Sequence, residues 1–134
     1  MPDPVRKYLR DIGCAQHIIR GGLEGLVERW EKTVASVEDG YALDIDSYLN
    51  DLDGRQLIEE TLRLDGIANQ SKYEERVRKA DERMRKVVRL SSRCLWGAEA
   101  AAENRWSAEK NWWYFTKPKS PGRELLEDLD RDRK

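Results

Sequence analysis

Residues 71–90, SKYEERVRKADERMRKVVRL, carry the clearest helical pattern of this 134-residue chain. Ser71 and Glu74 have the spacing of a capping box, which predicts that a helix begins there. Apolar and small residues then recur at alternating intervals of four and three, a heptad seam: Tyr73, Val77, Ala80, Met84, Val87 and Ser91. The pattern predicts a long amphipathic helix near Ser71–Leu90 that forms the spine of the fold. The small residues Cys94, Ala98 and Ala101 could continue the seam and let another helix approach closely.

The segments before this helix have the same periodicity. Asp3 and Pro4 are typical of a helix start, and Gly13 is typical of a helix end. A second amphipathic helix is predicted to end near Gly40, because apolar residues repeat at three and four: Leu23, Leu26, Val27, Trp30, Val34 and Val37.

Residues 45–62 contain two apolar stripes that do not share one helical face. The first stripe is Ile45, Tyr48, Leu49 and Leu52, and the second is Leu57, Ile58, Thr61 and Leu62. At about 100° per residue, the two stripes point in nearly opposite directions. We therefore predict a break at Asp53–Gly54, with one helix before it and another after it.

The composition favours helices with one solvated face. Charged residues make up 38% of the chain and apolar residues 39%, with only four prolines. The fold class predicted is all-α, a compact bundle of five or six helices with an aromatic C-terminal segment and a short tail helix. The domain is predicted to span 1–116, followed at 117–134 by an extended connector and a helical tail.

The net charge of −1 gives no global attraction to nucleic acid, but the charge is unevenly distributed. Residues 38–65 hold nine acidic and two basic side chains, and residues 72–93 hold nine basic and four acidic ones. We interpret the two blocks as facing each other across an antiparallel helix pair. The alternative is that the basic helix 72–93 binds RNA.

The run Trp112, Trp113, Tyr114 and Phe115 raises the question of how a protein covers four adjacent rings. On a helix these residues sweep about 300°, so one buried face cannot hold them all. They either plug the end of the bundle, with Trp30, Trp96 and Trp106 as cover, or remain partly exposed as a protein-binding surface. The predicted tail helix, which is too short to stand alone, could fold back over the rings. Its apolar side is formed by Leu125, Leu126 and Leu129.

Candidate chemistry is sparse. The acidic segment 44–60 includes Asn50–Gly54, which echoes a calcium-binding loop, but Leu49 stands where its first carboxylate ligand belongs. Cys14 and His17 have metal-ligand spacing, yet only Cys94 could add a third ligand of this kind. We therefore expect no metal and no cofactor, and interpret the acids as helix caps.

The function favoured is a small non-enzymatic helical protein-binding module, of adaptor, inhibitor or immunity type, that binds a protein partner or itself. The alternatives are a metal-dependent small enzyme that uses 44–60 and the RNA-binding protein. Because the N-terminus is charged and no apolar run approaches the ~18 residues of a membrane span, we expect a cytoplasmic protein without a membrane partner.

Overall fold

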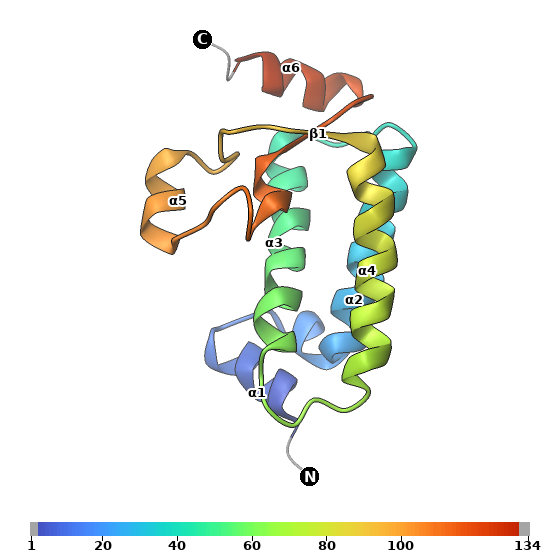
Figure 1. Ribbon diagram of the computed structural model, residues 1–134, viewed down its shortest axis with the longest axis vertical. Coiled ribbons are helices and arrows are strands. Elements are labelled where there is room, and N and C mark those ends of the chain that lie inside the picture. Colours follow the sequence, from blue (N-terminus) through green and yellow to red (C-terminus); the bar gives the residue numbers. More distant parts are fainter. Residues whose placement is uncertain (1–2, 132–134) are drawn as a thin grey trace.

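The computed structural model describes residues 3–131 and is mostly helical (Figure 1). The tail residues 132–134 lie outside the described part. In chain order the elements are α1 Pro4–Asp11, α2 Gln16–Glu38, α3 Ile45–Leu62, α4 Gln70–Val87, β1 Val88–Leu90, α5 Ala98–Asn104, the 3₁₀ turn η1 Trp112–Phe115, β2 Thr116–Pro118 and α6 Arg123–Arg131. The all-α prediction is confirmed, with an added antiparallel hairpin of two three-residue strands.

Helices α2, α3 and α4 run side by side along the long axis, and α1 lies at the end where α2 begins (Figure 1). The seam of α4 faces the core, since Val77, Ala80 and Met84 are buried. Helix α4 packs closely along α2, whose apolar face is buried from Leu23 to Val37. The heptad seam is therefore used inside one chain, against α2.

Both ends of α4 differ from the sequence prediction. The capping box is wrong, because α4 begins at Gln70, preceded by Asn69 in a left-handed conformation with φ of 59°. The Gln70 side chain instead donates to the backbone oxygen of Leu62 at 2.8 Å, which ties the helix start to the end of α3. At the other end Val88 turns extended and pairs with Pro118, so the seam does not continue to Cys94.

The predicted break at Asp53–Gly54 is also wrong, because α3 runs unbroken from Ile45 to Leu62. A straight helix with two apolar stripes needs cover on two sides, and α3 has it. Helix α2 packs along one side, while η1 and α6 pack on others. The buried side chains of α3 thus spread around the helix: Tyr48, Leu49, Leu52, Arg55, Ile58 and Thr61.

An unbroken α3 makes Gly54 a plain interior helical residue. A Cβ at Gly54 would meet no atom within 4 Å, and the backbone is not left-handed there. Gly54→Ala should therefore raise the free energy of unfolding by about 0.5–1 kcal/mol, since glycine loses more conformational entropy than alanine in a helix. Chemical denaturation measures the change. Gly66→Ala, at φ of 77°, is the contrasting variant and should destabilise; a loss of stability in Gly54→Ala would restore the break.

Helix α6 docks on the N-terminal end of α3. Leu125 and Leu129 are buried in the common core. The carboxylate of Asp128 accepts from the backbone N–H of Ile45 at 3.0 Å. The N–H of Gly122 donates to the Tyr41 oxygen at 3.1 Å. The tail therefore folds back, as the leucines suggested, but its contacts are with α3 and the loop before it.

Few ion pairs join the acidic block 38–65 to the basic block 72–93. The bases of α4 reach mainly to acids of α2, because Arg76 pairs with Glu24 and Glu31. Only the pair of Arg83 and Glu38 joins the blocks in the predicted sense. The pair between α3 and α4 has the opposite polarity, with the base on α3 and the acid on α4. The predicted charge interface between residues 38–65 and 72–93 is therefore limited to the pair of Arg83 and Glu38.

Candidate functional site

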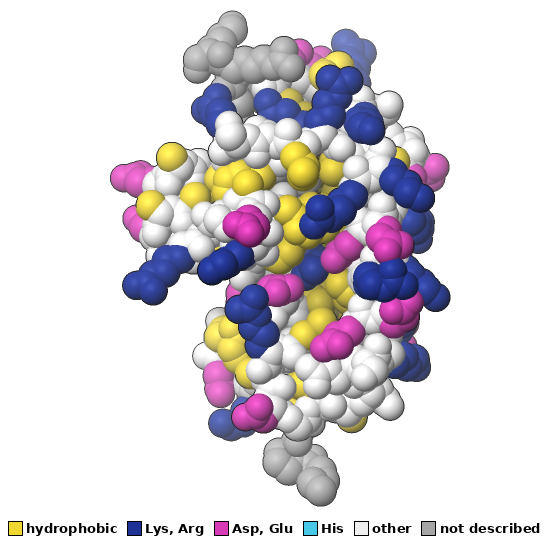
Figure 2. Space-filling view, viewed as in Figure 1, with side chains coloured by type: hydrophobic (Ala, Val, Ile, Leu, Met, Phe, Trp, Pro, Cys, Tyr) yellow, Lys and Arg dark blue, Asp and Glu magenta, His cyan; other side chains and the backbone are white. Residues whose placement is uncertain are grey.

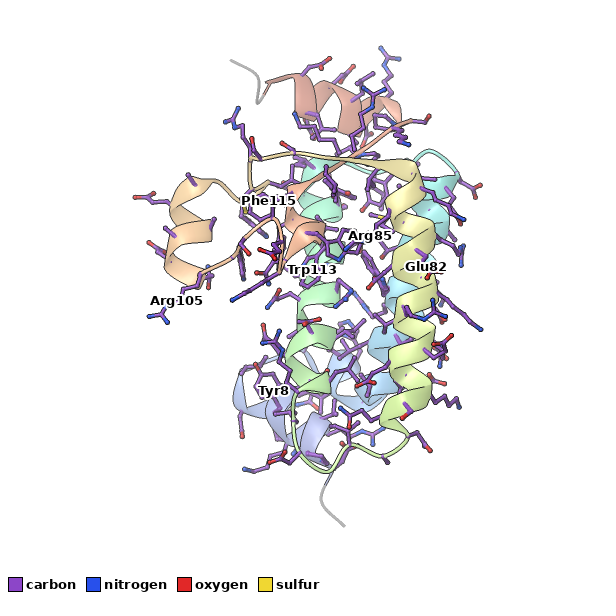
Figure 3. The ribbon with its side chains drawn as sticks, viewed as in Figure 1. Tyr8, Glu82, Arg85, Arg105, Trp113 and Phe115 are labelled. Atoms are coloured by element: carbon purple, nitrogen blue, oxygen red, sulfur yellow. The ribbon has the colours of Figure 1, made fainter. Side chains whose placement is uncertain are left out.

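All four rings of the aromatic run are buried, with exposed fractions of 5% or less. As a 3₁₀ turn they point in different directions, and several elements supply the cover. The guanidinium of Arg85 lies 4.4 Å from the Trp112 ring centroid. On the other side of the run, Trp106 stacks on Tyr114 at 4.2 Å. Figure 3 shows Trp113 and Arg85 in the space between α3 and α4. In this conformation the run forms a plug.

Two of the three tail leucines are buried as well. Leu125 and Leu129 are buried, whereas 47% of Leu126 is exposed. Of the seven protein-binding candidates, only Leu126 thus presents an apolar side chain to solvent. A contact role for Trp112, Trp113, Tyr114 and Phe115 stays a prediction that would require the plug to open.

The acids of 44–60 accept hydrogen bonds from separate partners. Asp44 caps α3 by accepting from the N–H of Ser47, as a capping role predicts. Three others accept from tyrosine hydroxyls: Asp51 from Tyr41 at 2.6 Å, Asp53 from Tyr114 at 2.7 Å, and Glu60 from Tyr8. No group of three or more His, Cys, Asp or Glu side chains in residues 3–131 could hold a metal ion.

Two of these pairs shift the pKa values of their members. The hydrogen bond to Glu60, with burial, raises the pKa of Tyr8 to about 12, because the carboxylate disfavours a second negative charge. Burial raises the pKa of Asp51, although its bond from Tyr41 acts in the opposite direction. Burial, followed by the hydrogen bond to Asp51, also raises the pKa of Tyr41. Tyr8 and Tyr41 therefore stay protonated at neutral pH and act as hydrogen-bond donors between segments that are distant in the chain.

Residues 91–111, here called the arm, leave the bundle and return to it. The arm contains α5, which has no buried residue and projects from the body in Figure 1. Its base is anchored by backbone bonds: Ser91 N–H donates to the Phe115 oxygen at 2.7 Å and Leu95 N–H to the Tyr114 oxygen at 2.8 Å. At its far end the Asn111 side chain donates to Gln56 at 3.0 Å. The arm is fixed at both ends while α5 contributes nothing to the core.

An apolar hollow of about 420 Å³ lies between the arm and the body, and we call it the arm groove. Most of its walls are small or apolar side chains: Ser92, Arg93, Cys94, Gly97, Ala98, Ala101, Trp106, Ser107, Ala108 and Phe115. Burial raises the pKa of the Cys94 thiol, so this side chain is uncharged and behaves as a small apolar wall. Figure 2 shows apolar side chains exposed where the arm meets the body.

On the hairpin side the arm groove is bordered by a smaller hollow, here called its rim, which shares Arg93, Cys94 and Gly97 with the groove and adds Leu95, Trp96 and Lys117. Trp96 is 44% exposed, and its indole N–H donates to Asp53 at 3.2 Å, which fixes the ring. In the hairpin register Lys117 is directly opposite Arg89. Neither of these two bases has an ion-pair partner within the described part of the chain.

The sequence prediction did not find this site. Its signal was the series Cys94, Ala98 and Ala101, which was interpreted as a continued seam of α4 for another helix to approach. These residues instead line the arm groove, and no helix in the described part of the chain packs closely on α5. Gly97, at φ of 99°, ends that possibility and instead begins α5. The pairing of Arg89 with Lys117 depends on a hairpin of three residues per strand, which is too short for a period-two pattern to reveal.

Comparison with protein-family models, with curated proteins and with solved structures finds no match for this chain. None of the helices formed by residues 3–131 combines the length and the apolar character needed to cross a membrane.

Proposed function

We propose that this chain is a non-enzymatic helical protein-binding module, of adaptor, inhibitor or immunity type, which acts in the cytoplasm through its arm groove. The observation that carries the proposal is that α5 is held in place without burying any residue of its own. Such an element does not stabilise the bundle through a core. What it does create is one wall of an apolar hollow beside an exposed tryptophan, the kind of side chain that anchors protein interfaces.

The alternatives have less support. For a metal-dependent enzyme, the acids of 44–60 would have to converge, and Asp44, Asp51 and Asp53 instead accept hydrogen bonds from separate backbone or tyrosine partners. For RNA binding by 72–93, Arg76 and Arg83 would have to leave glutamates of α2. Self-association through the heptad seam would compete with α2, since the seam is buried in the chain itself.

Site-specific photo-crosslinking in the native organism tests the proposal. A benzophenone amino acid placed at Trp96, at the rim, or at Ala108, in the arm groove, should give adducts with the same partner protein. The same probe at Lys79, an exposed residue of α4, is the control and should not give that adduct. Adducts that are absent at both arm positions, or equally strong at Lys79, would rule out the arm groove as the contact surface.

The same partner then allows a quantitative check. Trp96→Ala should weaken its binding about tenfold or more, the usual effect of removing an interface tryptophan. The melting temperature should change little, because the side chain is 44% exposed and makes one rim hydrogen bond. Calorimetric titration with calcium, magnesium and zinc addresses the enzyme alternative: saturable binding would favour it.

A further inference from the structure

The hairpin holds two like charges side by side. Arg89 and Lys117 are cross-strand partners, and side chains that are directly opposite project from the same face of a ladder. Like charges in this position are destabilising. Their strand neighbours Val88 and Pro118 are buried, so the two bases project from the other face of the strands. An arrangement that costs stability indicates a role outside the fold.

Among residues 3–131, no acid forms an ion pair with Arg89 or Lys117. The acidic helix α6 is at the same end of the molecule (Figure 1), but Glu127 pairs with Arg123, and Asp128 accepts from Ile45. On the opposite side of the arm, Arg105 and Lys110 line a hollow together with Glu59 and Glu60. Charge there is mixed. Arg89 and Lys117 have no ion pair within the described residues, so the hairpin gives the rim of the arm groove a positive edge.

We propose that the arm groove binds an acidic segment of the partner protein, with apolar side chains of the segment in the groove and its carboxylates at Arg89 and Lys117. This inference rests on the proposed function and adds the chemistry of the partner. The apolar walls provide burial for side chains such as leucine, and a hollow of about 420 Å³ is within the usual size of binding pockets, ~300–1,000 Å³. The basic edge then selects the sign of the flanking charges.

The same edge suits a nucleic acid less well. Binding of single strands uses a row of exposed aromatic rings on which successive bases stack. Here Trp96 is the exposed ring at the groove, while Trp112, Trp113, Tyr114 and Phe115 are buried. Apart from Arg93 and two serines, the groove walls are small or apolar side chains, which match the apolar side chains of a polypeptide better than a row of phosphates. A polypeptide is therefore the occupant that the lining and the rim favour together.

The test uses two synthetic 12-residue peptides with one leucine-rich core, flanked by glutamates in one and by lysines in the other. Fluorescence anisotropy at low salt should show the acidic peptide binding at least tenfold more tightly than the basic one. The preference should shrink at high salt, because exposed charges are screened. In the variant Arg89→Glu/Lys117→Glu the preference should reverse, so that the basic peptide binds more tightly. A merely structural role for the two bases would not produce a reversal.

Three controls complete the design. Lys32→Glu/Lys79→Glu makes the same change of net charge at exposed positions of α2 and α4 and should keep the acidic preference. The single variant Arg89→Glu places opposite charges across the strands, so it should melt no lower than the natural protein while losing most of the preference. The third control is an oligo-uridylate RNA, which should bind more weakly than the acidic peptide.

The inference is overturned if neither peptide binds, if both bind equally, or if the RNA binds more tightly and loses its affinity in the double variant. If arm crosslinks to a protein partner persist in any of these cases, only the chemistry proposed here fails and the binding function stands. If the crosslinks are absent as well, the proposed function fails with it.

Discussion

Arg55→Ala should destabilise the fold by about 3–5 kcal/mol, the usual cost of breaking a buried ion pair by removing one partner. The Arg55 side chain is 7% exposed and the carboxylate of Asp81, on the facing helix, is 17% exposed. The guanidinium donates two hydrogen bonds to this carboxylate, from Nε at 3.1 Å and from Nη2 at 2.9 Å. Its planar face lies 4.3 Å from the ring centroid of Trp113.

The large effect has a specific physical cause. After the substitution Asp81 keeps only the indole N–H of Trp30, at 2.9 Å, as a donor from this network. A carboxylate with little access to water and no cation beside it is costly, and Trp113 also loses a packing partner on its ring face. Arg55→Lys should give an intermediate loss, because an ammonium keeps the charge but not the two-nitrogen grip or the stacking.

Arg63→Ala is the matched control on the same helix. Arg63 also pairs with a glutamate, Glu59, but its side chain is 72% exposed. An exposed pair of this kind contributes only about 0–1 kcal/mol. Urea denaturation of the three variants measures the comparison. Equal losses for Arg55→Ala and Arg63→Ala would mean that the pair between α3 and α4 is not buried in solution.

The parts of the fold that the sequence predicted are those with one-sided burial. In α2 and in α4 the buried residues fall on one face of the helix, so the period of three and four appears directly in the residue order. Helix α3 is different, because α2, η1 and α6 all pack on it. Its apolar residues are spread around the axis, and a rule that assumes one face therefore predicted a break at Gly54.

The polar contacts could not be predicted for another reason. Asp53 accepts from Tyr114, which lies 61 residues along the chain, and Glu60 accepts from Tyr8, 52 residues away. No local spacing in the sequence indicates such distant pairs. The same acids could therefore be interpreted as helix caps, as metal ligands or as one side of a charge interface. The arm groove shares this property, since its walls come from the two ends of the arm and from Phe115.

Leu125→Ala should cost about 2–5 kcal/mol, whereas Leu126→Ala, at the adjacent residue, should change stability by no more than about 0.5 kcal/mol. Leu125 is fully buried where α6 meets the core, and Leu126 is 47% exposed. Truncating the first leaves a cavity beneath a helix that is too short to persist alone. Thermal unfolding, with a hydrophobic dye as a second probe, should show early release of α6 in Leu125→Ala only.

Comparing Leu125→Ala with Leu126→Ala also distinguishes the two roles considered for the tail leucines. If the tail were a free arm that binds a partner, both truncations would leave stability unchanged and both would weaken partner binding. If α6 is part of the fold, Leu125→Ala acts through stability, and any loss of binding in Leu126→Ala at unchanged stability identifies a contact on its exposed side. Gly122 supports the docked state, because a Cβ there would collide with the carbonyl oxygen of Tyr41. The connector thus passes so close to the body that only glycine fits, as expected for a helix held in one place.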